Sequence, residues 1–386
     1  MPLLWKELWL DTALEPFPKQ SPEEKIPYIA SIWFSRAGNT PISFHVRHQV
    51  NRCGDFFRQN LEFVLTTYQY RLHTLGIYVN RNQITPFQTF FIRPYPALET
   101  LILENVPFSY HSSFMTPNIR TLALISEPST SLIPDVYSCA ELTSLDLSRY
   151  AMDVAYWKNL LGTCTNLRKG AFFLRLSTIE ITPRNVCQQF LESLTLVLQG
   201  RHNSSLFGDL DLPALIHFSI TSSEDFSWNN DTHSQKFLHR LESLSLSLSL
   251  KDTEMIKLLR MTPSLNRLLV DIPKTSTGSF ITTLILTNDD QHVLPALHTL
   301  SLSIAYDRRN GVTPSTYHRL VESRWAIKVD ESFLPHRRLK RIDFKFKDEW
   351  SVTYFKNLIE PMVREGLVAS VTVLRVSKAS SIYSSI

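Results

Sequence analysis

The sequence predicts an α/β fold: a leucine-rich-repeat solenoid with a parallel sheet on its concave face, helices on its convex face and irregular curvature. The first observation behind this prediction is an L-x-x-L-x-L pattern that returns about every 24 residues, with Ile, Phe or Val allowed at its anchors. The second is the linker of about 15 to 20 residues between copies, which is too long for a hairpin and long enough for a crossover helix. The copies begin at Leu72, Leu98, Ile119, Leu142, Leu167, Leu191, Leu215, Leu241, Leu265, Leu297, Leu339 and Val371.

Each copy encodes one strand, in which alternate side chains point to opposite faces of the sheet. The segment LESLSLSLSL at 241–250 shows the alternation most plainly. Its leucines Leu244, Leu246, Leu248 and Leu250 share the inner face, so the intervening serines are expected on the outer one.

Helices are predicted between the strands from their capping residues and apolar spacing. In DVAYWKNLLG, Asp153 is the expected N-cap and Gly162 the expected stop. In KDTEMIKLLRMTP, Asp252 or Thr253 is the expected cap, and Pro263 follows the expected end. A strand, a helix and an extended proline turn therefore form the repeating unit.

The repeats depart from a regular array in two ways. Three residues after the last leucine, where regular short repeats carry Asn or Cys, this chain has residues such as Val106, Tyr150 and Gln199. The spacing between copies also lengthens after Leu265 and Leu297, which predicts insertions after about residue 270. We expect a leader at 1–50, which includes the first strand, followed by a single solenoid domain at 51–386.

Composition favours a reduced, intracellular environment. The four cysteines, Cys53, Cys139, Cys164 and Cys187, lie far apart and form no C-x-x-C pair. The opening MPLLWKELWLDTALEPFPKQ has no sustained apolar run of the kind that a secretory signal requires. A cytoplasmic or nuclear protein without membrane association is therefore expected.

Motifs for catalysis and cofactor binding are absent from the sequence. With 10 glycines the chain has no Gly-rich phosphate loop, and it has no H-E-x-x-H sequence. The nearest histidine pair, His45 and His48, is interpreted as part of a strand and its end rather than as a metal site. A non-enzymatic protein without cofactors is predicted.

The residues before, between and after the inward leucines are predicted to line the concave face of the solenoid, and small hydroxyl residues dominate that surface. One interpretation is that Ser and Thr simply tolerate an exposed strand and pair across it. The other is a flat, mostly uncharged surface for a protein segment, which makes the sheet face the leading candidate binding site. The candidate residues on this face are Asp146, Thr195, Ser219, Ser245 and Ser301.

Positive charge gathers in HRRLKRIDFKFK at 336–347. Either these charges solubilise a terminal repeat, or they attract an acidic or phosphorylated partner. Nucleic-acid binding is the least favoured alternative because the stretch is short and the rest of the chain is near neutral. The candidate partner-binding residues here are Arg337, Arg338, Arg341 and Lys345.

The chain resembles the F-box proteins with degenerate leucine-rich repeats of basidiomycete fungi. The resemblance rests on MPLLWKELWL at the start, WFSRAGNTPISFHV at 33–46, TPxL or LPAL before leucine strands, LVESRW at 320–325 and REGLVASVTV at 364–373. In that family a three-helix F-box docks on an adaptor of a cullin-type ubiquitin ligase, and the repeats take the protein substrate.

Only the last piece of an F-box, Pro2 to Leu10, matches that family at the start of this sequence. The resemblance implies a substrate-recognition module of a ubiquitin ligase receptor, with an adaptor as partner if an upstream F-box exists. The alternative is a stand-alone repeat scaffold without a ubiquitin role. These two alternatives stay open at the level of the sequence.

Overall fold

The computed structural model describes residues 2–11, 25–48, 55–79, 94–105, 118–125, 139–176, 185–200, 206–207, 209–225, 228, 236–272, 279–286, 293–304, 312–325 and 338–374. The chain divides into two compact units. Unit 1 comprises Met1–Leu174 and Gln188–Leu191, and unit 2 comprises Arg175–Cys187 and Glu192–Ile386.

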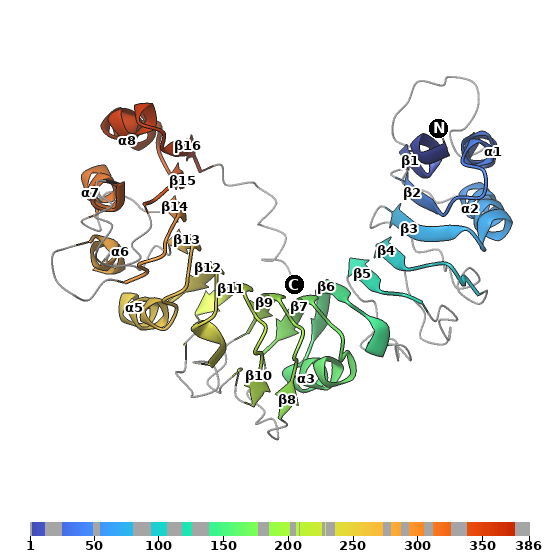
Figure 1. Ribbon diagram of the computed structural model, residues 1–386, viewed down its shortest axis with the longest axis horizontal. Helices are drawn as coiled ribbons and strands as arrows, with labels where there is room; N and C mark the ends of the chain where they lie inside the picture. Colours follow the sequence, from blue (N-terminus) through green and yellow to red (C-terminus); the bar gives the residue numbers. More distant parts are fainter. Residues whose placement is uncertain are drawn as a thin grey trace. The chain divides into compact units, whose positions relative to one another are not determined.

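Unit 1 is a parallel sheet with strands in chain order, β1 to β7, flanked by helices (Figure 1). Its elements are the short 3-10 helix η1 (Pro2–Trp5), β1 (Glu7–Asp11), α1 (Ile26–Arg36), β2 (Ile42–His48), α2 (Asp55–Tyr68), β3 (Leu72–Val79), β4 (Thr100–Glu104), β5 (Thr121–Ile125), the 3-10 helix η4 (Cys139–Glu141), β6 (Ser144–Met152), α3 (Val154–Thr163) and β7 (Lys169–Arg175). The described part of the first fifty residues includes η1, β1, α1 and β2, and both strands belong to the sheet.

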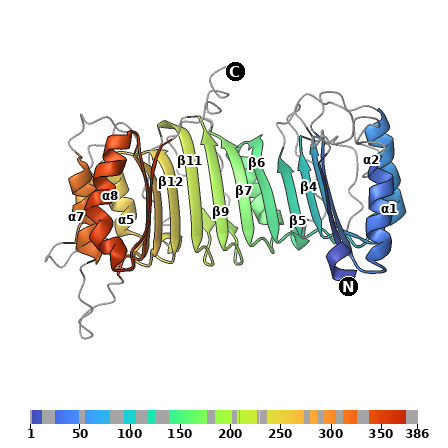
Figure 2. The same ribbon diagram turned by 90° about the horizontal axis from the view of Figure 1, so that it is seen from above.

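Unit 2 repeats the plan with a parallel sheet in the order β9, β11, β12, β13, β14, β15, β16. Helices α5, α7 and α8 lie along one face of its later strands (Figure 2), and α6 lies between α5 and α7 (Figure 1). The elements are β8 (Val186–Cys187), β9 (Ser193–Gln199), β10 (Leu210–Asp211), β11 (His217–Asp225), β12 (Ser243–Ser249), α5 (Asp252–Arg260), β13 (Arg267–Ile272), α6 (Ser279–Leu284), β14 (Thr299–Ile304), α7 (Pro314–Trp325), β15 (Arg341–Phe346), α8 (Glu349–Arg364) and β16 (Val368–Val373); β8 and β10 form a separate parallel pair.

The leucine-rich-repeat fold predicted from the sequence is confirmed: the cores of the copies from Leu72 to Leu339 each form one parallel strand with buried inward residues. The copy predicted to begin at Val371 is out of register, because β16 spans Val368–Val373 and pairs Val371 with Phe344. Leu244, Leu246 and Leu248 of β12 are at most 3% exposed, while the serines between them are half-buried. In β15, Ile342 and Phe344 are fully buried, as their alternation predicts. Burial of one such side chain stabilises the fold by roughly 1.5–3 kcal/mol, so the leucine ladder supplies most of the driving force.

The helix caps confirm one prediction and correct two. Asp153 caps α3, because its Oδ1 accepts the Tyr156 N–H at 2.6 Å. Gly162 does not stop that helix, which continues to Thr163. The N-cap of α5 is Lys251 rather than Asp252 or Thr253.

Asp252 has a different role from the one the sequence suggested. It is buried at the first position of α5, and its Oδ2 accepts bonds from the Ser279 N–H at 2.7 Å and the Ser279 hydroxyl at 2.8 Å. The carboxylate therefore ties the start of α5 to the start of α6. Sequence alone favoured a cap because Asp is common at that position.

One asparagine forms hydrogen bonds across the strand ends, although it does not stand three residues after the last leucine, where regular repeats carry Asn. Asn105 lies one residue before Val106, adopts a φ of 54°, and donates from Nδ2 to the Val79 carbonyl at 3.0 Å. Its own N–H donates to the Ile125 carbonyl at 3.0 Å. Asn tolerates this left-handed backbone better than most residues, so it can join three neighbouring repeats.

A buried arginine fixes the loops around α7. Arg324 is 2% exposed, and its guanidinium donates to the carbonyls of Leu284, Val293 and Leu294 at 2.7–2.9 Å. Burial lowers the pKa of Arg324 to about 10, which still leaves it charged at neutral pH. Leu294 has a φ of 57°, a strained conformation for leucine that this hydrogen bond helps to hold.

Candidate functional site

Most of the predicted binding residues lie together on the sheet of unit 2. We call the strand face that alternates with the buried leucines the open face. Register places Thr195, Ser219 and Ser245 on adjacent strands, β9, β11 and β12. Leu269 of β13 follows Ser245 in the same row, and Ser301 of β14 follows Leu269. Four of the five residues predicted on the sheet face therefore form one row, interrupted by a single leucine that the sequence reasoning did not place there.

Further hydroxyl side chains flank this row on both sides. We call the whole set the hydroxyl track: Ser193, Ser243, Thr299, Thr195, Ser219, Ser245, Ser301, Thr221, Ser247 and Ser303. Neighbouring strands lie about 4.8 Å apart, so these groups, which can both donate and accept hydrogen bonds, stand close together. His217 of β11 and the exposed Arg267 and Asp271 of β13 interrupt the two flanking rows. Such a surface suits an extended peptide backbone or a flat protein surface.

Asp146 belongs to unit 1 and is not part of the hydroxyl track. It lies on β6, half-buried, and its Oδ1 accepts the Ser148 N–H at 2.9 Å. One oxygen is therefore engaged by its own strand. Its register neighbours on β5 and β7 are Ala123 and Ala171, which leave the carboxylate without a crowded surface around it.

The basic stretch is partly neutralised within the chain. Arg341 forms a bidentate pair with Asp343 on the same strand, at 2.9 and 3.2 Å, and this hydrogen bond and the charge of Asp343 raise the pKa of Arg341. Lys345 is exposed on β15, and Arg337 lies outside the described residues. The structure therefore brings Arg341 and Lys345 to the open face of the same strand, beside an acidic residue.

Arg338 is engaged in a cluster at the end of unit 2. Its guanidinium lies over the Trp325 ring, 3.4 Å from the centroid, and contacts Glu365 at 3.5 Å. The Trp325 indole N–H donates to the same carboxylate at 2.9 Å. The cluster joins the end of α7, the approach to β15 and the end of α8, so Arg338 contributes to packing.

A pocket of about 370 Å³ opens in unit 2 where β14 and β15 end and α7 and α8 begin. Its apolar floor includes Ile304, Tyr317 and Phe346. Trp350 and Tyr354, one turn apart on α8, stack with centroids 5.1 Å apart and line one wall. The carboxyl ends of parallel strands are a frequent place for ligands, and this pocket is large enough for a side chain of a bound protein. Sequence reasoning missed it because its lining comes from four separate elements.

Unit 1 carries an aromatic stack on its open face that the sequence reasoning also missed. The Trp9 and His45 rings are parallel, at an interplanar angle of 3° and a centroid distance of 3.9 Å. Tyr78 of β3 lies 5.8 Å from Trp9. Burial lowers the pKa of His45, while the nearby Glu7 charge opposes that shift. The E-L-W-L-D alternation at 7–11 was the signal that could have placed Trp9 on a strand face.

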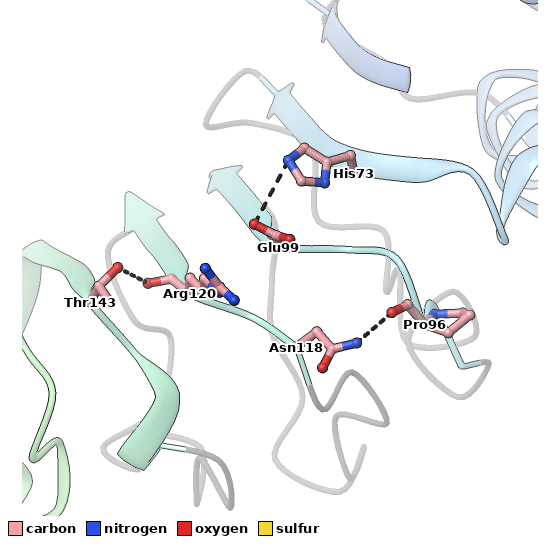
Figure 3. A network of polar contacts seen from close by, with 6 residues as sticks. All are labelled: His73, Pro96, Glu99, Asn118, Arg120 and Thr143. Atoms are coloured by element: carbon pink, nitrogen blue, oxygen red, sulfur yellow. Dashed lines mark hydrogen bonds and ion pairs between the residues drawn. The ribbon is translucent and has the colours of Figure 1, made fainter. Parts of the chain in front are cut away.

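A polar network lines the entry to strands β3 to β6 of unit 1 (Figure 3). His73 and Glu99 approach at 3.8 Å, and Asn118 donates from Nδ2 to the Pro96 carbonyl. The Thr143 hydroxyl donates to the Arg120 carbonyl at 3.2 Å. A pocket of about 210 Å³ follows, lined by Arg120, Glu141, Thr143, Asn166, Arg168 and Phe190. These bonds mainly fix one repeat to the next.

The described parts of the chain contain neither a candidate metal centre nor a candidate membrane-spanning helix. No three His, Cys, Asp or Glu side chains there gather in a way that would hold a metal ion. Among the helices that the structure describes, none is long and apolar enough to cross a membrane. Of the cysteines, Cys164 is buried and Cys187 exposed, both as free thiols.

Comparison with known proteins yields similarity to solved structures alone. No family model and no curated protein matches the chain. TLR13, solved in complex with ssRNA13, is 15% identical with a TM-score of 0.41 over 87% of this chain. The chain spans 45% of the length of that TLR13 chain. An internalin (inlF) from Listeria monocytogenes is 12% identical with a TM-score of 0.35, covering 96% of this chain and 87% of the internalin.

Proposed function

We propose that this chain is a protein-recognition module whose open sheet face in unit 2 holds an extended segment of a partner protein. The observation that carries the proposal is the hydroxyl track, in which Thr195, Ser219 and Ser245 stand in register on adjacent strands. The central row, which contains no charged residue from Thr195 to Ser301, can satisfy the backbone of an incoming segment without the desolvation cost of buried charges. The pocket beside Trp350 supplies room for one anchoring side chain of the same class of partner.

The finer role that we propose is substrate recognition for an F-box-type ubiquitin ligase, in the cytoplasm or nucleus. It is supported by the sequence resemblance, whose markers LVESRW and REGLVASVTV meet in the structure where Trp325 donates to Glu365. An adaptor of the ligase would then bind an F-box outside the repeats. The competing proposal is a stand-alone scaffold without a ubiquitin role. Under both proposals the chain is a binding protein rather than an enzyme.

The surface is tested by placing bulk and charge on the track. We expect Ser219→Arg with Ser245→Arg to abolish proximity labelling of the partners seen with the wild-type chain in its own cells, since both side chains would stand in the contact area. The matched control is Thr253→Arg with Thr353→Arg, which adds the same charge to exposed positions of α5 and α8. Equal labelling by both double variants would exclude the track as the binding surface.

The ligase role is tested by mapping the 5′ end of the transcript and assaying the encoded protein. An in-frame upstream F-box, adaptor binding by that longer protein, and slower turnover of a labelled partner when the gene is deleted would together support it. A transcript that starts at Met1, together with unchanged partner turnover, would leave the scaffold alternative.

A further inference from the structure

On the open face of unit 1 the Trp9 ring is exposed to solvent and stacks on the ring of His45. Trp9 is 55% exposed, although the residue beneath it, His45, is only 5% exposed. The two rings are parallel at 3.9 Å, so His45 covers one face of the indole. The exposed area of Trp9 is therefore its opposite face and its edge. A flat π surface of this kind is left open at the first strand of the sheet.

The register of the sheet and one glycine make this support possible. Trp9 pairs with His45 across β1 and β2, and His45 pairs with Gly76 across β2 and β3. A Cβ atom at position 76 would lie 2.3 Å from Nδ1 of His45 and 2.9 Å from the Tyr78 ring. Only glycine therefore leaves the imidazole room to lie under Trp9.

The charges around the ring favour a cation. The indole N–H of Trp9 donates to Oε1 of Glu7 at 2.7 Å, which holds the ring and adds electron density to its π face. The open-face positions of β1 to β4 carry the carboxylates of Glu7, Asp11 and Glu104 against one guanidinium, that of Arg47. Among these described open-face side chains, carboxylates therefore outnumber guanidinium groups, although the chain as a whole has a net charge of +4.

The same face already contains an example of the chemistry. Arg47 lies over the Tyr78 ring with its guanidinium carbon 5.6 Å from the centroid. A cation over an aromatic ring gains about 0.5–1 kcal/mol at an exposed site, and tryptophan is the best of the three rings. Trp9 is the stronger ring of the pair, and among the residues that the structure describes no guanidinium or ammonium group lies over it.

We propose that Trp9, supported by His45 and polarised by Glu7, is an anchor for an arginine or lysine side chain of a protein segment on the open face of unit 1. The attribution to a protein segment rests on the proposed recognition function. The chemistry of the anchor, a cation on an electron-rich indole beside carboxylates, rests on unit 1 alone.

The test uses the full chain labelled with 5-fluorotryptophan, which gives one fluorine resonance for each of the 7 tryptophans. Trp9→Phe identifies the Trp9 resonance by its loss. We expect acetyl-Gly-Arg-Gly-amide to shift that resonance saturably, with a dissociation constant in roughly the millimolar range. The acetyl-Gly-Glu-Gly-amide and acetyl-Gly-Phe-Gly-amide peptides should leave it in place.

Two variants sharpen the test without removing the reporter. Glu7→Gln keeps the size of the side chain and removes its charge, and we expect it to weaken binding of the arginine peptide about two- to fivefold. Phe63→Ala is the matched control: Phe63 on α2 is also 55% exposed, and its loss should leave the titration unchanged. The other six resonances report that each variant is folded.

The outcomes separate this proposal from the proposed function. No saturable shift of Trp9 at about 100 mM arginine peptide, or an equal shift with the glutamate or phenylalanine peptide, would overturn the cation anchor and leave recognition by unit 2 standing. Conversely, a normal titration at Trp9, together with unchanged partner labelling by the Ser219 and Ser245 double variant, would retain the anchor and remove the hydroxyl track.

Discussion

The two open faces are built on the same strand pattern and have opposite chemistry. In unit 2 the row through Thr195, Ser219 and Ser245 is neutral and nearly flat. In unit 1 the corresponding row begins with Trp9, His45 and Gly76, where large rings stack beside a residue with no side chain. The leucines that face the core are alike in both. The repeat therefore determines where a side chain stands, and only the outward residues determine what it can bind.

The two open faces also differ in how many particular residues each one requires. The hydroxyl track needs only that each strand keep its period of two, so any one serine contributes little. The stack of unit 1 needs three particular residues on three strands, because a side chain at Gly76 would occupy the space of His45. A single substitution should therefore damage unit 1's surface more than unit 2's.

The largest expected effect lies in unit 2, beneath the surface, at Arg324. Replacing it with methionine removes three hydrogen bonds to the carbonyls of Leu284, Val293 and Leu294. We expect a loss of about 3–5 kcal/mol in the free energy of unfolding, because three carbonyls lose a charged buried donor and only that of Leu294 keeps another, the Leu297 N–H at 3.3 Å, among the bonds of the described residues. Chemical denaturation followed by hydrogen exchange measures it.

The exchange pattern tells whether the two units depend on each other. We expect amide protection to fall in α6 to α8 while unit 1 keeps its protection. Arg319→Met, at an exposed position of the same helix, is the control and should change stability little. A loss of protection spread evenly over both units would contradict separate stability.

The second largest loss of stability is expected when a side chain is added at Gly76 of unit 1. Gly76→Ala places a Cβ against His45 and Tyr78, and we expect a cost of about 1–3 kcal/mol from overpacking. Gly162→Ala is the matched control, since a Cβ there meets nothing within 4 Å and the position lies in α3. That control should be neutral or stabilising by up to about 1 kcal/mol, because alanine favours the helix. Similar destabilisation by both variants would show that crowding at His45 is not the cause.

Several of these features could be predicted from the sequence, and the reason is locality. The period of two in LESLSLSLSL, the Asp153 cap and the inward Ile342 and Phe344 depend on residues close in the chain, so pattern reasoning found them. Arg324 and Trp325 stood in a sequence motif, but nothing local shows that the arginine donates to carbonyls 30 to 40 residues away.

The aromatic stack was missed for the same physical reason. Trp9, His45 and Gly76 meet through sheet register, and the segment that carries Trp9 was expected to be largely a leader. A glycine inside a strand pattern, as in LHTLGIYV at 72–79, is the available signal, because it often marks a close approach. Asp146 was grouped with Thr195, Ser219, Ser245 and Ser301 because all five occupy the same position within their strands. The strand position does not show which unit a strand belongs to, and Asp146 belongs to unit 1 while the other four belong to unit 2.

The pH dependence of unit 1 stability, measured with and without the imidazole of His45, tests the contribution of this residue to the stack. Burial lowers the pKa of His45 in the folded chain, so the unfolded state binds the proton more readily. The stabilising contribution is therefore complete above the ordinary histidine pKa of about 6.5 and is lost as the pH falls through the lower folded value. We expect His45→Gln to flatten the decline in unit 1 stability on acidification from pH 7, measured by denaturation at a series of pH values. His239→Gln, exposed in unit 2, should leave that slope unchanged, and an equal slope in the wild type and His45→Gln would contradict the assignment.

The smallest effect on stability is expected on the hydroxyl track. Ser219→Ala with Ser245→Ala removes two hydroxyl groups from the open face while keeping both strands, and the free energy of unfolding should change by less than about 0.5 kcal/mol per site. Partner labelling should nevertheless fall, because the lost groups would bond the incoming segment. Thermal denaturation and proximity labelling of the same samples measure the two quantities. A large loss of stability would mean that the hydroxyl groups stabilise the sheet itself as cross-strand pairs. The side chains of the unit 2 surface would then depend on one another, as those of the unit 1 stack do.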